Sequence, residues 1–572
     1  MRAAHNGNAA PKGPGLPSSR IWWLLVIFLG LALVWAGRLV YLQIIKAPEY
    51  SEAAAASRTL SIDIPARRGT IYDRNGNVLA TSVEATTVYV NPKEITDVSG
   101  TASALAETLG GDAEDYTDYL TQDTTFVYVK RQADVEDADA LRAKGLTGVY
   151  FLDDTKRVYP YGETAGQIVG LVDVDGNGLT GLELYYDDIL SGTPGERVFQ
   201  TGGVDKNGDS IPIPDGTEVD EPAVDGQDIV ISIDIDMQKD LEDRLEQGVD
   251  EIGGTDGSAV LMDASSGEIL AMASTPFLNP SDTSKIDEGA DSIKAVTYAF
   301  EPGSIFKTVS AMALLESTDI TPDVKIDCPA YLEAEDGYTV SDSHKRADAV
   351  FTFREIINQS SNVGISLAVR DYLGFGPLYD KILTYGLNET TGVDYPGEAG
   401  GYLAPDVESW STIAKYNLTF GQGVSVTPLQ MVRFYGAIAN NGVACTPHLL
   451  ISKPQTGETP TYETKQIIEN TDAIPTMISM LETVVTDGTG TGAAIDGYTV
   501  AGKTGTAEYA DEENGGYVSG SWNLDFTGFL PDASLPLVCF VGVNEVPYER
   551  NTTEVFHDIM ADAIDRYGIV QD

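Results

Sequence analysis

An uninterrupted apolar segment near the N-terminus constrains this chain more than any other feature. Residues 21–37 carry no charge, and residues 39–45 prolong the apolar run past Arg38. With a rise of about 1.5 Å per residue, a helix of this length reaches the lower limit of a membrane span. We therefore predict a transmembrane helix over 21–45, preceded by a tail over 1–20 and followed by a large polar region.

The charges beside this segment predict its orientation. The tail contains Arg2, Lys12 and Arg20 and no acidic residue. The positive-inside rule then places the tail in the cytoplasm and the rest of the chain outside a cell membrane crossed once. A signal peptide cleaved after Ala36 is the competing interpretation. The apolar run continues past that residue, which favours the anchor.

Composition limits what the polar region can do. A length of 572 residues suffices for two or more domains. A hydrophobic content of 42% excludes global disorder. The formal net charge is −51. Nucleic acids and anionic lipid surfaces are bound through Lys and Arg, so we expect the polar region to bind neither. We interpret the acidity as a solvated surface.

A serine and a lysine three residues apart form the first candidate catalytic motif. On a helix, this spacing puts Ser304 and Lys307 on one face, where the amine can reach the hydroxyl. Pro302 and Gly303 predict a loop that enters a helix at Ser304, where outward-pointing N–H groups can hold an oxyanion. A neutral lysine could serve as the base that a serine nucleophile needs. Taken alone, the pair could equally be an ordinary first-turn serine beside a solvated lysine.

Two further motifs follow in a telling order. Residues 360–362 read Ser-Ser-Asn, with a hydroxyl that could relay a proton and an amide that could hold a substrate amide. Residues 503–506 read Lys-Thr-Gly-Thr and follow a β-branched run that predicts a strand. Gly505 would let a substrate backbone approach that strand closely. The order of the three motifs is that of serine acyl-transfer enzymes of the penicillin-binding and β-lactamase type.

With these motifs, the chain resembles the class B penicillin-binding proteins, the monofunctional peptidoglycan D,D-transpeptidases, and most of all their division and sporulation group. Residues 420–430 and 526–531 are similar to family signatures on either side of the third motif. Residues 260–272 look like the hairpin that opens the catalytic domain. Residues 67–76 and 181–183 resemble motifs of the N-terminal region.

The resemblance implies an α+β architecture behind the single transmembrane helix. Residues 46–225 would form an elongated β-rich pedestal of the penicillin-binding protein dimerisation type. Residues 229–572 would form a transpeptidase domain, an antiparallel sheet flanked by helices. The proline- and acid-rich segment 212–228 predicts the boundary between them. Because the chain ends soon after the third motif, no C-terminal repeat domain is expected.

Local patterns predict individual elements. Asn75-Gly76 predicts a hairpin in the pedestal, and a second hairpin is expected over 258–273. Helices are expected after Ser304 and near Ile356, and strands near Val500 and Leu537.

The resemblance also implies a role for each motif residue. Ser304 would attack the penultimate D-alanyl carbonyl of a peptidoglycan stem peptide, with Lys307 as general base, and β-lactams would acylate it as substrate mimics. Ser360 would relay protons, and Asn362 would bind a substrate amide and position a lysine. Lys503 would bind the substrate carboxylate and relay a proton. The remaining substrate-binding residues would be Thr504, Gly505 and Thr506, the last with an oxyanion N–H.

The cellular role and partners follow from the resemblance alone. Septal cell-wall synthesis is expected, with elongation and sporulation as alternatives within the class. A polytopic membrane glycosyltransferase and other division proteins would be partners of the transmembrane helix and the pedestal.

Other functions differ at the second chemical step or lack chemistry. A class A β-lactamase needs a Glu-x-x-Leu-Asn segment between the second and third motifs, and this chain has none. A β-lactam sensor would acylate without turnover, and a D,D-carboxypeptidase would share the motifs but commonly lacks this N-terminal region. A division scaffold is the alternative of a different class, and intact motifs argue against it.

No metal or cofactor is expected. Residues 173–178 begin like a calcium loop, but the twelfth position is Leu184, and a bidentate Glu is required there. The four histidines lack zinc-ligand spacing, and none is placed to complete a histidine-based triad, which leaves lysine as the base.

Overall fold

A computed structural model describes most of the chain. The described residues are 18–47, 59–204, 210–212, 218–335, 337–510, 517–547 and 550–571. They fall into two compact units, of which the smaller comprises 1–64 with 194–223 and the larger 65–193 with 224–572.

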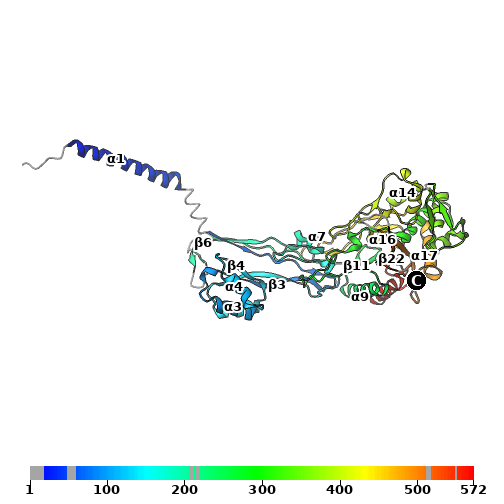
Figure 1. Cartoon of the computed structure of the whole chain (residues 1–572), viewed down its shortest axis with the longest axis horizontal. Helices are drawn as coiled ribbons and strands as arrows, with labels where there is room; N and C mark the ends of the chain where they lie inside the picture. Colours follow the sequence, from blue (N-terminus) through cyan, green and yellow to red (C-terminus); the bar gives the residue numbers. More distant parts are fainter. Residues whose placement is uncertain are drawn as a thin grey trace, which may run out of the picture. The chain divides into compact units, whose positions relative to one another are not determined.

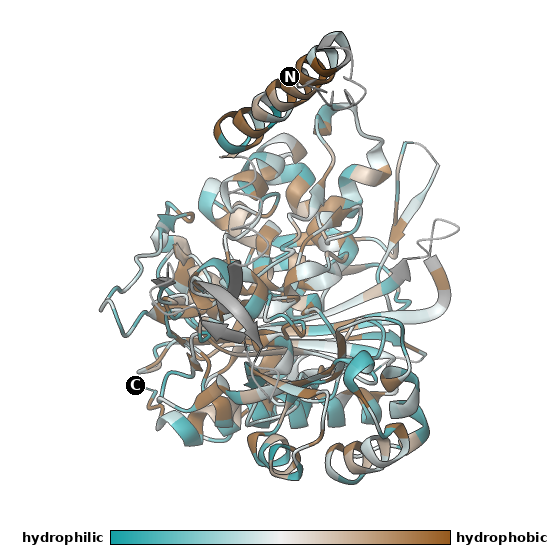
Figure 2. Cartoon of the chain, turned by 90° about the vertical axis from the view of Figure 1, so that its left-hand side faces the viewer, coloured by the Kyte–Doolittle hydropathy of each residue, from teal (hydrophilic) through white to brown (hydrophobic). Residues whose placement is uncertain are grey.

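The smaller unit contains the apolar helix. Helix α1 (Ser18–Val40) continues into a π-helical turn, η1 (Tyr41–Ile45). Figure 2 shows this helix coloured as hydrophobic over most of its length, and Ile21–Ile45 is apolar and long enough to cross a membrane. The predicted apolar helix is therefore confirmed, and it is consistent with a single-pass anchor. The strands described in this unit form an antiparallel sheet of β1 (Thr59–Ile64), β6 (Gly195–Val204), β7 (Ser210–Pro212) and β8 (Glu218–Glu221).

A six-stranded sheet supports the N-terminal part of the larger unit. Its order is β19-β9-β2-β3-β4, with β5 also paired to β3. The strands are β2 (Ile71–Tyr72), β3 (Val78–Val90), β4 (Val127–Ala133), β5 (Val149–Val158), β9 (Ile229–Ile231) and β19 (Leu450–Ser452). The predicted Asn75-Gly76 hairpin joins β2 to β3 and is confirmed. Gly76 adopts φ +86°, a conformation that glycine accepts without strain.

Helices cover this sheet at one end. Figure 1 shows α3 and α4 beside β3 and β4, and buried residues such as Val88 and Leu105 join these elements in one core. The helices of this part are α3 (Val98–Leu109), α4 (Ala113–Leu120), α5 (Val135–Lys144), α6 (Gly166–Val169), α7 (Gly181–Tyr185) and α8 (Asp187–Leu190).

The calcium-like segment forms a turn whose first carboxylate is hydrogen-bonded within the turn itself. The Asp173 carboxylate accepts hydrogen bonds from the backbone of Asp175 and from both the backbone and side chain of Asn177. Asp175 pairs with Arg131 at 2.7 Å. These acids are therefore occupied by protein donors.

A five-stranded antiparallel sheet forms the centre of the C-terminal part. Its order is β11-β10-β23-β22-β21. The strands are β10 (Asp256–Asp263), β11 (Ile269–Ser274), β21 (Ala501–Ala510), β22 (Tyr517–Phe529) and β23 (Leu537–Val546). The hairpin predicted over 258–273 and the strands predicted near Val500 and Leu537 are confirmed.

Two helical layers cover the two faces of this sheet. Successive side chains of a strand point to opposite faces, so Val260 and Leu261 of β10 belong to different cores. Leu261 packs in the core formed with α9 (Ile235–Ile252) and α18 (Thr553–Tyr567). Val260 packs in the larger core, which contains α11 (Lys307–Ser317), α16 (Pro428–Ala439) and α17 (Ile474–Asp487). The predicted α+β class is confirmed.

Shorter elements complete the larger core. The helices are α10 (Lys294–Thr297), α12 (Phe353–Asn358), α13 (Asn362–Ala368), α14 (Phe375–Thr384) and α15 (Thr412–Leu418). The strand pairs are β12 (Lys325–Cys328) with β15 (Ala349–Thr352), β13 (Tyr331–Glu333) with β14 (Thr339–Ser341), β16 (Tyr402–Leu403) with β17 (Val424–Ser425), and β18 (Val443–Cys445) with β20 (Thr464–Gln466). The helices predicted after Ser304 and near Ile356 correspond to α11 and α12.

Candidate active site

The three motifs meet at one cavity of about 320 Å³ in the larger unit. Each motif comes from a different element: the 3₁₀ turn η3 (Gly303–Phe306), the junction of α12 and α13, and the edge strand β21. The lining residues are Gly303, Ser304, Ser343, His344, Gln359, Ser360, Asn362, Phe420, Gln422, Thr489, Thr504, Thr506, Arg550 and Asn551.

Ser304 lies in the tight turn that leads directly into α11. Gly303 before it adopts φ +51°, and its N–H donates to the backbone oxygen of Gly421 at 3.0 Å. A Cβ on Gly421 would fall 2.4 Å from the backbone oxygen of Gly303, so this close packing requires glycine. The segment 420–423 therefore holds the turn that presents Ser304.

A continuous chain of polar contacts joins the three motifs. Nζ of Lys307 lies 2.8 Å from Oγ of Ser304 and 3.0 Å from Oγ of Ser360. Nζ of Lys503 donates to the same Ser360 oxygen at 3.0 Å. The two lysines and two serines thus form a route along which protons can move between the reacting hydroxyl and β21.

The backbone of Ser360 is held in an unusual conformation. Its φ is +57°, a region that non-glycine residues rarely adopt and that costs of order 1–3 kcal/mol. In this conformation its backbone oxygen accepts from Nζ of Lys307 at 2.6 Å while its hydroxyl contacts both lysines. The strain therefore coincides with a geometry in which one residue contacts both amines.

Burial lowers the pKa of both lysine amines. The side chains of Lys307 and Lys503 are fully buried. Burial, with a further effect from the Lys503 charge, holds the pKa of Lys307 well below its usual range, although Asp342 acts in the opposite direction. Burial lowers the pKa of Lys503 to about 7, and Asp525 opposes this effect. A neutral Lys307 beside Ser304 can accept a proton at neutral pH.

Asp342 fastens the second motif to the β13–β14 strand pair. Its carboxylate accepts from Oγ of Ser361 at 2.9 Å and from the N–H of Val363 at 3.0 Å, at the start of α13. Arg346 pairs with the same carboxylate at 2.6 Å. Asn362 donates from Nδ2 to the backbone oxygen of Ser341 at 3.0 Å and faces the cavity. Its roles toward substrate and lysine stay predictions.

The third motif presents alternate residues of β21 to the cavity. Thr504 and Thr506 line it, and Oγ1 of Thr489 lies 2.6 Å from Oγ1 of Thr504. Lys503 and Gly505 point to the opposite, buried face, where a Cβ on Gly505 would lie 2.1 Å from Oδ1 of Asp525. Asp525 of the neighbouring strand β22 therefore occupies the space beside Gly505, and the close approach of a substrate backbone there stays a prediction.

Several site residues were missed by sequence reasoning. Asp342, Thr489 and Asp525 belong to no recognised motif, and they reach the site only through tertiary contacts. His344, Arg550 and Asn551 line the cavity from loops whose local sequence carries no structural signal. The motif-based residues were found because their spacing follows a known order.

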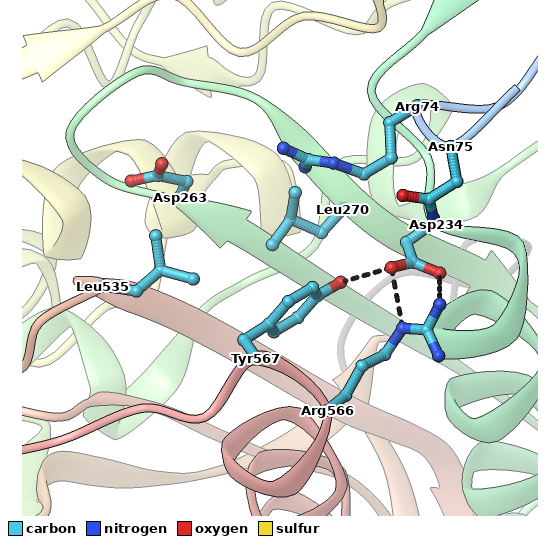
Figure 3. Close-up of a pocket in the computed structure, with 8 residues that line it drawn as sticks. All are labelled: Arg74, Asn75, Asp234, Asp263, Leu270, Leu535, Arg566 and Tyr567. Atoms are coloured by element: carbon cyan, nitrogen blue, oxygen red, sulfur yellow. Dashed lines mark hydrogen bonds and ion pairs between the residues drawn. The ribbon is translucent and has the colours of Figure 1, made fainter.

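A second cavity, of about 400 Å³, lies away from the three motifs. Figure 3 shows Arg566 and Tyr567 from α18 directed at Asp234, and Arg566 donates to that carboxylate at 2.7 Å. Arg74 on the other wall pairs with Glu268 at 3.2 Å. Both arginines of its lining are held in ion pairs, and no residue of the three motifs lines it, so this cavity is not the candidate active site. Within the described ranges, no three His, Cys, Asp or Glu side chains converge as metal ligands would.

Comparisons with known proteins agree with this geometry. Residues 257–561 match the family described as penicillin binding protein transpeptidase domain, and residues 63–231 match the penicillin-binding protein dimerisation domain. The probable peptidoglycan D,D-transpeptidase PbpC of Pseudomonas aeruginosa is 31% identical over 96% of this chain and 95% of its own length. Stage V sporulation protein D of Bacillus subtilis is 30% identical over 92% of this chain and 81% of its own length.

A solved structure is similar over nearly the same span. The crystal structure of penicillin binding protein 3 from Mycobacterium tuberculosis, complexed with aztreonam, superposes with a TM-score of 0.68 and 28% identity. The match covers 89% of this chain and 97% of that one. The fold, the site and these similarities define a serine acyltransferase of the cell wall.

This chain belongs to the class B penicillin-binding proteins, which combine a dimerisation domain with a transpeptidase domain. It is a peptidoglycan D,D-transpeptidase that acts on peptidoglycan and binds β-lactams.

Proposed function

We propose that Ser304 is the nucleophile of this transpeptidase and that Lys307 is its general base. The observation that carries the proposal is the contact of 2.8 Å between Nζ of Lys307 and Oγ of Ser304. Burial of Lys307 supports it, because a neutral amine can accept the serine proton as the hydroxyl attacks a carbonyl.

The first acyl transfer consumes the donor stem peptide. Ser304 Oγ bonds to the penultimate D-alanyl carbonyl carbon while its proton passes to Lys307. The bond to the terminal D-alanine nitrogen then breaks, and that nitrogen takes a proton from Oγ of Ser360. Lys503, 3.0 Å from that oxygen, replaces this proton. The products are an ester on Ser304 and free D-alanine.

The second transfer makes the cross-link. An amino group of a neighbouring stem peptide attacks the ester carbonyl and loses a proton along the same route in reverse. The bond to Ser304 Oγ breaks, and the serine regains its proton from Lys307. By family resemblance, the backbone N–H groups of Ser304 and Thr506 stabilise the oxyanion in both steps. A donor of this kind is worth about 3–4 kcal/mol in comparable enzymes.

The third motif binds the substrate carboxylate. Thr504 and Thr506 line the cavity, and Lys503 lies beneath them as the nearest buried amine. Hydroxyl donors above a protonated lysine fit the terminal carboxylate of the donor peptide or of a β-lactam. Gly505 keeps the strand free of a side chain on the buried face, and Asn362 binds the substrate amide.

Fluorescent penicillin labelling tests these assignments. Full-length protein in detergent should take up a stable label, and mass spectrometry of the labelled peptide should find the acyl group on Ser304. Ser304→Ala should abolish labelling while leaving the thermal midpoint unchanged. Ser310→Ala is the matched control, because Ser310 is a buried serine of α11, after the turn that holds Ser304, and it donates to the backbone of Thr419.

Label on another residue would overturn the assignment of the nucleophile. Rapid loss of label would indicate a hydrolase of the β-lactamase kind. Absence of label on folded protein would favour the scaffold alternative.

We also propose a septal role and an anchored arrangement. Residues 1–20 would be cytoplasmic, 21–45 would span the membrane, and 46–225 and 229–572 would be the pedestal and the transpeptidase domain outside it. The basic tail supports this orientation. A polytopic glycosyltransferase would bind the span and pedestal. The likeness of residues 360–364 and 420–430 to division and sporulation enzymes supports a septal or sporulation role over elongation.

A sporulation role is the second candidate, favoured by the similarity to stage V sporulation protein D. A fluorescent fusion in the source bacterium distinguishes the roles. Midcell localisation in growing cells and filamentation on depletion would support septal synthesis. Signal confined to sporulating cells would replace it, and signal along the side wall would indicate elongation.

A further inference from the structure

A buried carboxyl group lies behind the third motif, and the reaction as described above does not use it. Asp525 on β22 has an exposed fraction of 2%, and within the described residues neither of its oxygens has a hydrogen-bond partner. It borders a cavity of about 20 Å³, room for one water molecule. A buried, unpartnered carboxyl group is costly, so its presence here needs an explanation.

Strand register places this carboxyl group on the same face as Lys503. Lys503 is opposite Thr527, and Gly505 is opposite Asp525, in the antiparallel pair β21–β22. Directly opposed residues point to one face, so Lys503 and Asp525 are diagonal neighbours on it. The carboxyl group also occupies the space that a side chain at Gly505 would fill, since a Cβ there would lie 2.1 Å from Oδ1. It is therefore within short electrostatic range of the lysine.

Other titratable groups also lie near this cavity, and their contacts are as follows. Lys294 on α10 pairs with Asp256 of β10 at 2.8 Å. The hydroxyl of Tyr435 on α16 donates to the backbone of Ile305 at 3.0 Å. Tyr298 also lines the cavity. On the side of the active site, the charged group that faces Lys503 is the amine of Lys307, with Ser360 between them. Asp525 is thus the acid whose charge favours the protonated form of Lys503, whereas Asp342 acts in this way on Lys307.

We propose that Asp525 is a positioning residue for the transpeptidase reaction: its carboxylate is the buried counter-charge that keeps Lys503 protonated and able to bind a carboxylate. The proposal rests on the assignment of Lys503 as the carboxylate-binding residue. Burial raises the pKa of Asp525 and lowers the pKa of Lys503, while the charge of each opposes the shift of the other. The two groups therefore ionise as a coupled pair.

The pH profile of acylation tests this coupling. The second-order rate constant for fluorescent penicillin should fall at low pH as Lys307 is protonated and at high pH as Lys503 loses its proton. Asp525→Asn removes the negative charge and keeps the shape, so Lys503 should lose its proton at lower pH. We expect the alkaline limb to move down by at least one pH unit, about a tenfold loss of rate on that limb. The acid limb should stay in place.

Matched variants separate charge from packing. Thr527→Val alters the residue directly opposite Lys503 without changing charge, and both limbs should stay in place. Asp525→Ser is a second, smaller charge-free variant, whose hydroxyl can bond to a water in the cavity, and it should reproduce the shift of Asp525→Asn. Thermal midpoints identify which variants fold.

The outcomes are distinct. An alkaline limb that stays in place in a folded Asp525 variant overturns the proposal. So does a loss of rate that is uniform with pH, because that indicates packing alone. If wild-type label does not map to Ser304, the proposed function fails instead. If it does, and only the limb shift is missing, the failure concerns Asp525 alone.

Discussion

Two groups of buried charged side chains in the larger unit are built in opposite ways. In the pedestal charge cluster, Glu183 lies between two arginines, 2.5 Å from Nε of Arg68 and 2.7 Å from Nε of Arg157. Asp187 pairs with Arg68 at 2.6 Å. In the active-site lysine pair, Lys307 and Lys503 contact hydroxyl and carbonyl oxygens, with no carboxylate among their described hydrogen-bond partners.

The protonation of the two groups differs accordingly. Burial lowers the pKa of Arg68, but Glu183 and Asp187 outweigh it, and the net pKa is raised. Burial lowers the pKa of Lys307 and Lys503, and the carboxylates of Asp342 and Asp525 offset this lowering only in part. A buried cation with close carboxylate partners keeps its charge and holds segments together, whereas a buried amine with a lowered pKa can exchange protons near neutral pH. Both groups are buried, so it is the immediate partners of each charge that separate the structural role of the arginines from the proton-transfer role proposed for the lysines.

Removal of the catalytic amine should give the largest effect. Lys307→Met replaces the buried amine with an apolar side chain of similar size. We expect the acylation rate to fall by about 10²–10⁴-fold, as for loss of a general base. The thermal midpoint should stay the same or rise, because no ion pair is broken. Stopped-flow labelling and thermal unfolding measure both. A large drop in midpoint would show that the lysine is also structural.

Removal of the pedestal carboxylate should give the reverse pattern. Glu183→Gln leaves two buried guanidinium groups without their shared partner, which should cost about 3–5 kcal/mol of unfolding free energy. Acylation by the folded fraction should be unchanged. Glu107→Gln is the control, because its ion pair with Lys144 is exposed and should contribute nothing measurable. Equal thermal midpoints for Glu183→Gln and Glu107→Gln would show that the buried ion pairs of Glu183 do not stabilise the fold.

The pH dependence of stability should distinguish the two groups next. Folding lowers the pKa of Lys503 from 10.5 to about 7, so the unfolded chain binds a proton that the folded chain lacks between these values. Stability therefore rises with pH in this range. Burial of Lys503 does not lower the free energy of unfolding above about pH 10.5, where the amine is neutral in both states, and lowers it progressively as the pH falls toward 7. Lys503→Met should flatten this part of a plot of unfolding midpoint against pH. An unchanged slope would contradict the depressed pKa.

The smallest effect is expected at Asp342, whose carboxylate is paired with Arg346 and holds the second motif in place. Asp342→Asn should weaken the contacts to Ser361 and Val363 and cost about 1–2 kcal/mol of stability. Acylation should slow severalfold because the second motif is held less firmly. Labelling kinetics and thermal unfolding of Asp342→Asn and Arg346→Gln measure this. No change in acylation would mean that Ser360 is positioned by α12 and α13 alone.

Much of the site could be predicted because it lies in local motifs. Ser304 and Lys307 are separated by one helical turn, so their proximity follows from helix geometry. The Asn75-Gly76 turn follows from its turn residues, and the β10–β11 hairpin is expected from its resemblance to the family. The roles carried over by resemblance for Asn362 and the third motif remain predictions.

The apolar helix, the hairpins and the three motifs can be recognised in the sequence alone, because each depends on neighbours within a few residues. Three features arise only when distant segments fold together: the positive φ of Ser360 between two lysines, the contacts of Asp342 with the second motif, and the position of Asp525 behind Gly505. The charge on a buried lysine depends on how much solvent is removed and on which carboxylates come within a few ångströms. Those quantities arise from strands and helices distant in the chain, and no local pattern contains them.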